Sequence, residues 1–220
     1  MAFRILVAAD MHAEEEAAER IVKKISSGKF GALIILGDIT NLGPVSFAED
    51  FFSNAKAAAP KTRIFAIPGN MDPYEVLEVM EKKGASIQGK KAALSGPWEI
   101  VGLGGSPRAG RGPTEYDEDE ALGKMRKLGI GPRTILAAHS PAYELLGLDK
   151  IPSGLSVGSR ALRSIVEEKK PGALLSGHIH ETEGIGKSGE TVVVKVAPAF
   201  NGRAAILELG KGIKAELINL

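Results

Sequence analysis

Short apolar runs alternate with longer amphipathic segments over most of the chain, which is typical of an α/β protein. The apolar runs predict strands at 4–9, 32–36, 63–67, 98–105, 134–139 and 173–180. The amphipathic segments between them predict helices at 14–26, 45–58, 73–83, 115–128 and 159–170. This alternation favours a largely parallel sheet with helices outside it.

The last forty residues have a different pattern. Turn-forming stretches separate three apolar segments there, namely TVVVKVAP, RAAILELG and IKAELINL. Such spacing predicts antiparallel strands and hairpins, with a hairpin turn at Asn201-Gly202. The two patterns together predict an α/β fold of two packed, mixed β-sheets flanked by helices.

No linker, internal repeat or low-complexity tract divides the 220 residues, so a single domain over 1–220 is expected. The longest non-periodic segment is the Gly/Pro/Arg-rich stretch 106–120, which predicts a lid or an active-site loop rather than a boundary. The first ten residues are too short an apolar run for a signal sequence or a membrane span. A cytoplasmic protein without a membrane partner is therefore expected.

The charge balance is close to neutral, with 28 Lys and Arg against 27 Asp and Glu. A net charge of +1 and 11 aromatic residues, with no basic stripe, disfavour a nucleic-acid polymer as partner. The absence of cysteine excludes disulfides, thiolate metal sites and a cysteine nucleophile. Any bound metal must therefore use His, Asp, Glu or Asn.

Polar residues of metal-ligand type follow five of the predicted strands: Asp10, His12, Asp38, Asn70, His139, His178 and His180. Ligands bind at the carboxyl ends of strands in open α/β sheets, so we expect these side chains to meet. All four histidines of the chain belong to the set, which makes a chance arrangement improbable. Glycines 37, 69 and 177 lie beside these residues, where the backbone must turn sharply or approach closely.

The spacing of these residues resembles that of the calcineurin-like metallophosphoesterase superfamily. The motifs occur in order as Asp10-Met11-His12, Gly37-Asp38, Gly69-Asn70-Met71-Asp72, His139 and Gly177-His178-Ile179-His180. Each motif is weak alone, but five in order after predicted strands form a specific signal that spans most of the chain. The resemblance implies a four-layer α/β/β/α sandwich, in agreement with the periodicity.

The resemblance also implies two metal ions. One would be held by Asp10, His12, Asp38 and His180, and the other by Asp38, Asn70, His139 and His178. Asp38 would bridge them, and catalysis by a metal-bridged hydroxide would involve Asp38, Asn70, His139 and Asp72. Nitrogen and oxygen ligands suit Mn, Fe or Zn, and the sequence does not choose among these metals.

The chain departs from the superfamily at Met71, where many members carry a histidine that acts as general acid. A thioether cannot donate a proton, and the other histidines are all assigned as ligands. Either Asp72 with a raised pKa or a metal-bound water is left as the acid. Met71 itself either packs as a flexible apolar side chain or shapes the leaving-group pocket.

Three further polar side chains are weaker candidates for substrate contact. Asn41 either reaches the substrate or, as we favour, caps the helix that begins near residue 44. Arg108 and Arg111 either bind a phosphate from the rim of the site or, as we favour, remain solvated loop charges. The acidic run 116–120 suits a helix N-terminus better than a third metal site.

These observations predict a binuclear-metal phosphodiesterase acting on a small phosphodiester. The alternatives left open are a phosphomonoesterase, a nuclease, and a non-catalytic scaffold of the same fold, as in a trafficking-complex subunit that resembles this superfamily. All seven ligand positions retain coordinating residues, which favours an enzyme over a scaffold. The native metal, the physiological substrate and a homo-oligomeric state are not defined by the sequence.

Overall fold

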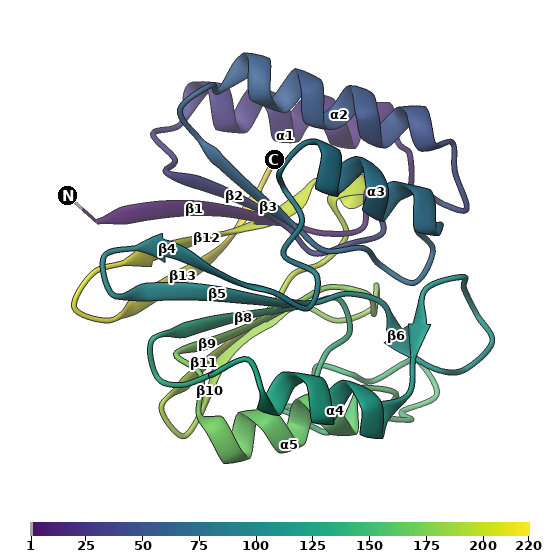
Figure 1. Cartoon of the computed structure of the whole chain (residues 1–220), viewed down its shortest axis with the longest axis vertical. Helices are drawn as coiled ribbons and strands as arrows, with labels where there is room; N and C mark the ends of the chain where they lie inside the picture. Colours follow the sequence, from purple (N-terminus) through teal and green to yellow (C-terminus); the bar gives the residue numbers. More distant parts are fainter. Residues whose placement is uncertain (1) are drawn as a thin grey trace.

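A computed structural model describes residues 2–220 of the chain. Two mixed β-sheets pack face to face, and helices cover the outer face of each sheet, so that four layers follow one another (Figure 1). The helices are α1 (Glu15–Ser27), α2 (Val45–Ala58), α3 (Tyr74–Lys82), α4 (Glu118–Arg126) and α5 (Arg160–Lys169). The first three lie on one sheet and the last two on the other (Figure 1). The predicted fold class is thus confirmed.

The first sheet has the strand order β13-β12-β1-β2-β3. Its strands are β1 (Phe3–Ala8), β2 (Ala32–Ile35), β3 (Arg63–Ala66), β12 (Arg203–Leu209) and β13 (Ile213–Asn219). β1, β2 and β3 are parallel, as their alternation with helices predicts, whereas β12 and β13 form an antiparallel hairpin. β12 then pairs antiparallel with β1 and joins the end of the chain to its beginning.

The second sheet has the order β10-β11-β9-β8-β5-β4. Its strands are β4 (Lys91–Ser95), β5 (Trp98–Leu103), β8 (Thr134–Ala138), β9 (Ala173–Ser176), β10 (Gly184–Ser188) and β11 (Thr191–Lys195). The central four are parallel, and the two edge strands are antiparallel to their neighbours. The segment 106–116 adds the two-residue strands β6 (Ser106–Pro107) and β7 (Glu115–Tyr116), which pair with each other.

The prediction of antiparallel strands and hairpins in the last part of the chain is correct for β12 and β13 but wrong between β11 and β12. β11 lies in the second sheet, where it forms an antiparallel hairpin with the short edge strand β10 and pairs in parallel with β9. The Asn201-Gly202 turn joins no hairpin, because the chain crosses there from the second sheet to the first. A short 3-10 helix, η1 (Ala199–Asn201), makes this crossing, and Gly202 ends it with a left-handed φ of 73°.

The core explains why the central strands are apolar without alternation. On β1, Ile5 and Val7 face the cluster between the two sheets, while Leu6 and Ala8 face the cluster under α1, α2 and α3. A strand that is buried on both faces has few positions for a polar side chain. Polar residues therefore begin where the strands end, and this arrangement places them at the edge where the candidate site forms.

Phe52 on α2 tests the packing of the helical layer against the first sheet. Its ring is buried in the cluster beneath α1, α2 and α3. We expect Phe52→Ala to lower the free energy of unfolding by about 3–5 kcal/mol, because it removes buried apolar surface and leaves a cavity. Urea denaturation measures the change. Tyr74→Ala is the control, since Tyr74 is 68% exposed, and equal losses in the two variants would contradict this packing.

Candidate metal centre

The seven predicted ligand residues lie together at the carboxyl ends of five strands. They follow β1, β2 and β3 in the first sheet and β8 and β9 in the second. Six of them form two groups whose potential ligand atoms lie within 4.8 Å of one another: Asp10, His12 and His180, and Asp38, His139 and His178. Asn70, the seventh, contacts the second group through His139.

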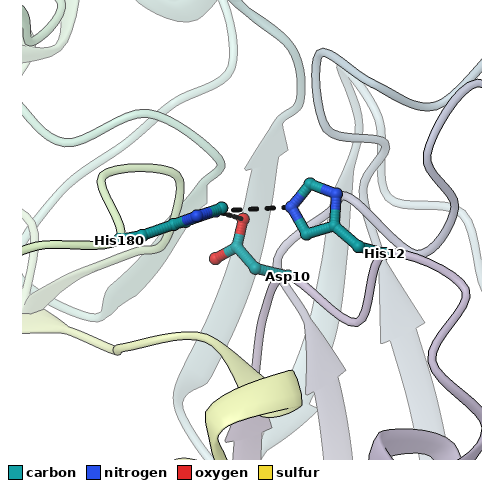
Figure 2. Close-up of side chains that lie close together, drawn as sticks. All are labelled: Asp10, His12 and His180. Carbon is teal, nitrogen blue, oxygen red and sulfur yellow. Dashed lines mark hydrogen bonds and ion pairs between the residues drawn. The ribbon is translucent and has the colours of Figure 1, made fainter.

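The first group combines side chains from both sheets (Figure 2). The Nε2 atoms of His12 and His180 face each other at 3.3 Å, and His180 Nε2 lies 3.7 Å from Asp10 Oδ1. Asp10 is fully buried, yet its Oδ1 atom has no hydrogen-bond partner among residues 2–220. Burying a carboxylate oxygen without a hydrogen-bond donor costs free energy unless a cation or another group binds it.

The second group is centred on Asp38. Its Oδ2 atom lies 3.4 Å from His139 Nε2 and 3.6 Å from His12 Nε2, so this oxygen stands between the two groups. Its Oδ1 atom accepts a hydrogen bond of 2.8 Å from the backbone N–H of Met71. Asn70 Oδ1 lies 3.0 Å from His139 Nε2. One carboxylate is therefore in reach of both sets of imidazole nitrogens.

The donor set fits metal ions. Imidazole nitrogens and carboxylate or amide oxygens converge, no thiolate is present, and the unpartnered Asp10 oxygen points into the first group. The orientation of His139 is fixed, because its Nδ1 donates a hydrogen bond of 2.7 Å to the carbonyl of Leu36 and thus turns Nε2 toward Asp38. Such hydrogen bonds commonly orient metal-binding histidines.

Four of the candidate ligands have left-handed backbone conformations. The φ angles are 57° at Asp10, 51° at His12, 47° at Asp38 and 74° at His178. This region costs a non-glycine residue roughly 1–3 kcal/mol, and it clusters at functional sites when the surrounding structure enforces it. Strain at four ligands is an observation that residue spacing alone could not supply.

Two of the predicted glycines allow close contact between the ligand loops. A Cβ atom at Gly69 would lie 2.0 Å from Asp38 Oδ1, and one at Gly177 would lie 2.7 Å from Asp10 Oδ2. Any side chain at these positions would displace a candidate ligand. Their role is close approach, since neither residue has a positive φ.

The charges in the centre shift the pKa values of its members. Burial, together with the charge of the nearby His139, lowers the pKa of His178 to about 3. Burial would also lower the pKa of His139, but the Asp38 and Asp10 carboxylates outweigh it and raise the pKa to about 9. Burial would raise the pKa of Asp10, whereas the contact with His180 and the charge of His139 hold it well below its usual range. The carboxylates of Asp10 and Asp38 therefore favour a cationic neighbour.

Asp72 lies behind the ligands. Its two carboxylate oxygens accept hydrogen bonds from Ile39 N, Thr40 N, Thr40 Oγ1 and Gly69 N, at 2.8–3.2 Å. Burial and the charge of Asp38 raise the pKa of Asp72 to about 6 in spite of these donors. The side chain is fully buried and joins the loops after β2 and β3, and it does not line the cavity described below. This geometry favours a structural role over proton donation.

Lys195 on β11 supports the loop that carries His178 and His180. It is fully buried, and its Nζ donates to the carbonyls of Ile179, Thr182 and Val196 at 2.6–3.0 Å. Burial lowers the pKa of Lys195 to about 8, although the Asp10 carboxylate opposes this shift. Sequence reasoning missed this lysine because it lies within an apolar strand and matches no motif.

A cavity of about 530 Å³ opens over the two groups. Its lining residues are His12, Glu14, Asp38, Asn41, Asn70, Met71, Arg111, His178, His180 and Phe200. Of the weaker candidates, Asn41, Met71 and Arg111 reach this cavity, whereas Arg108 does not.

The favoured interpretation of Asn41 as a helix cap is wrong, because α2 begins after Pro44 and no side chain caps it. The acidic run does begin a helix, since Asp117 caps α4.

Phe200 and Glu14 are cavity residues that the sequence did not indicate. The Phe200 ring meets the rings of His12 and His180 edge-on, with centroids 5.6 and 5.2 Å apart. Its backbone N–H donates to the Asp10 carbonyl at 3.3 Å, which draws η1 to the end of β1. This contact depends on the crossing between the sheets, so it required the three-dimensional structure.

Comparison with known proteins now gives the class of protein. The sequence profile described as calcineurin-like phosphoesterase matches residues 3–182, and the chain belongs to this family. It is therefore a hydrolase that acts on phosphoester bonds. None of the helices within residues 2–220 has the length and apolar character to cross a membrane.

Individual relatives agree with the assignment. The uncharacterized protein MJ1162 of Methanocaldococcus jannaschii is 28% identical, with 89% of this chain and 88% of that protein covered. A dimetal phosphatase from Danio rerio is 11% identical, with 99% and 98% covered and a TM-score of 0.62. An archaeal phosphodiesterase is 10% identical, with 99% and 100% covered and a TM-score of 0.59. The two structural similarities show a shared fold.

Lys195→Met tests the support of the histidine loop. We expect it to lower the free energy of unfolding by about 2–4 kcal/mol, because two carbonyls of this loop and the carbonyl of Val196 lose a charged donor. It should also weaken Mn²⁺ binding, since the loop carries two candidate ligands. Urea denaturation and calorimetric titration measure the two effects. Lys187→Met, on the exposed face of β10, is the control. A Lys195 variant that matches it in both measurements would contradict this role.

Proposed function

We propose that residues 1–220 act as one cytoplasmic domain, a binuclear-metal phosphodiesterase that hydrolyses a small phosphodiester. The observation that carries the proposal is the placement of Asp38 Oδ2 between two groups of buried nitrogen and oxygen donors. Asp10, His12, Asp38 and His180 would hold one metal ion, and Asp38, Asn70, His139 and His178 the other. The donor chemistry fits Mn, Fe or Zn.

Two bound cations would supply Lewis acidity, which generates a hydroxide nucleophile near neutral pH and neutralises charge on the phosphate. The chain holds the ligands for this chemistry in place. The Met71 N–H fixes one oxygen of Asp38 and leaves the other directed at the histidines. The Leu36 carbonyl fixes the tautomer of His139. The reacting phosphate would enter through the cavity, which Asn41 and Met71 help to line.

The charge of the cavity favours a diester over a monoester. A phosphodiester carries one negative charge, whereas a monoester carries close to two near neutral pH. Apart from the histidines, Arg111 is the only cationic side chain among the lining residues, whereas Glu14 and Asp38 are acidic, so the two proposed metal ions would supply most of the positive charge. A monoanionic substrate fits this balance better. The names of the two structural relatives, a phosphatase and a phosphodiesterase, are compatible with either substrate class.

The proposal is tested by comparing hydrolysis of bis-(p-nitrophenyl) phosphate and p-nitrophenyl phosphate. Metal-stripped protein is reconstituted separately with Mn²⁺, Fe²⁺, Zn²⁺ and Mg²⁺. We expect metal-dependent turnover with a preference for the diester. Asp38→Asn should lower both metal occupancy and rate by orders of magnitude, because a single carboxylate serves both groups.

Three results would overturn this proposal or part of it. An Asp38→Asn variant that keeps two metals and full turnover would reject the shared-ligand assignment. A wild-type protein with two metals bound and no turnover of either substrate would favour a scaffold. Preferential hydrolysis of the monoester would leave the family assignment intact and reject the diester.

Met71→His tests the position of the leaving group. The new imidazole would enter the cavity beside Asn70 and could protonate a leaving oxygen. We expect the rate to rise about tenfold or more for a diester with an alkyl leaving group, and less for one with a p-nitrophenyl leaving group. Met71→Leu, which keeps an apolar side chain, is the control. Equal changes for both leaving groups would show that residue 71 is not near the leaving oxygen.

A further inference from the structure

The loop that carries Arg111 is fixed to the metal centre at its C-terminal side. The Thr114 backbone N–H donates to the Asn70 carbonyl at 3.2 Å, and its Oγ1 donates to the Asp72 carbonyl at 2.7 Å. Gly112 touches the same segment, since a Cβ atom there would lie 2.2 Å from Asn70 O. The loop therefore follows the position of a candidate metal ligand.

The N-terminal side of the same loop is held by Glu115. Its carboxylate accepts hydrogen bonds from the backbone N–H groups of Ala109, Gly110 and Arg111 at 3.1, 2.9 and 2.7 Å. Three donors on one carboxylate curl the backbone around it, and charge-assisted bonds of this kind are stronger than neutral ones. Glu115 does not line the cavity, so its hydrogen bonds hold the loop backbone in place without forming part of the cavity wall.

The Arg111 side chain lines the cavity with no partner of its own. Within residues 2–220, its guanidinium has neither a hydrogen bond nor an ion pair, although its backbone is fixed. Met71 lines the same cavity and offers no hydrogen-bond donor from its side chain. A guanidinium presents several donors in a planar fork that matches phosphate oxygens. Arg111 thus provides donors that Met71 lacks.

We propose that Arg111 binds the phosphate oxygens of the substrate from the open side of the cavity, and that Glu115 is the positioning residue that holds Arg111 there. The proposal rests on the proposed function, because the metal centre would bind the other oxygens of the same phosphate. It reverses the expectation that Arg111 is a solvated loop charge. Arg108 remains a solvated charge, since it does not line the cavity, whereas Arg111, which is also exposed, does line it.

The first experiment measures the binding of inorganic phosphate to the Mn²⁺-loaded protein by calorimetry, which requires no turnover. Arg111→Ala should weaken phosphate binding about tenfold to a hundredfold, and Arg111→Lys should recover only part of it, because a lysine keeps the charge but loses the fork. Arg108→Ala removes the same charge from the same loop and should change the affinity less than about twofold.

The second experiment separates positioning from general stability. Glu115→Gln should weaken phosphate binding about threefold to tenfold, and it should have no further effect in the Arg111→Ala background, because it acts through Arg111. Trypsin should cleave metal-free Glu115→Gln after Arg111 at least about fivefold faster than the wild type, since the backbone is no longer held. Thermal unfolding of each variant verifies the fold.

The outcomes distinguish this proposal from the proposed function. Unchanged phosphate affinity in Arg111→Ala, or no detectable phosphate binding by wild-type protein, would overturn the role of Arg111 even if diesters are hydrolysed. Additive effects of Glu115→Gln and Arg111→Ala would overturn the positioning role. Loss of phosphate affinity in Arg111→Ala would support the role of Arg111 even if the preferred substrate is a monoester.

Discussion

Two hydrogen bonds across the interface between the sheets determine the geometry of the metal centre. The His178 backbone N–H donates to Asp10 Oδ2 at 3.1 Å, and His139 Nδ1 donates to the Leu36 carbonyl at 2.7 Å. Each bond joins a loop of the second sheet to the end of a strand in the first. The apolar cluster between the sheets holds these strand ends at a fixed separation, because close-packed side chains resist sliding. The ligand positions are therefore a property of the whole sandwich.

The rigid packing of the sheets holds the ligand loops in left-handed backbone conformations. Four candidate ligands occupy a costly region of φ and ψ, and two buried ionisable groups, Asp72 and Lys195, bind the backbone of the loops that carry two of them, Asp38 and His178. Their hydrogen bonds are directed at groups that would otherwise be free to relax toward ordinary conformations. Burying these two ionisable side chains costs free energy, and in return their hydrogen bonds help to fix the geometry of the metal centre. Neither side chain needs to meet the substrate in order to matter for the reaction.

The sequence predicted the architecture, and it also predicted that seven polar side chains at strand ends would lie together, because both depend on local signals. The apolar runs end where the strands end, so polar residues such as Asp38 and His139 mark the edge of a sheet directly in the chain, although these side chains are themselves buried. The crossing at Asn201-Gly202 resembled a hairpin turn because one glycine conformation serves both. Phe200 and Glu115 could not be found in this way, since they act through contacts made after the sheets pack. Asn41 was misinterpreted for a similar reason, because a residue type that caps helices also suits a cavity wall.

The candidate ligands are spread from position 10 to position 180, and neighbours in space come from opposite ends of this interval. The closure of such long chain segments is slow relative to local helix formation. A complete coordination sphere therefore forms only after both sheets have docked, and the unfolded chain offers at most the isolated pairs around residues 10 and 180. Metal ions bound at this centre would therefore add their binding free energy to the stability of the assembled sandwich as a whole.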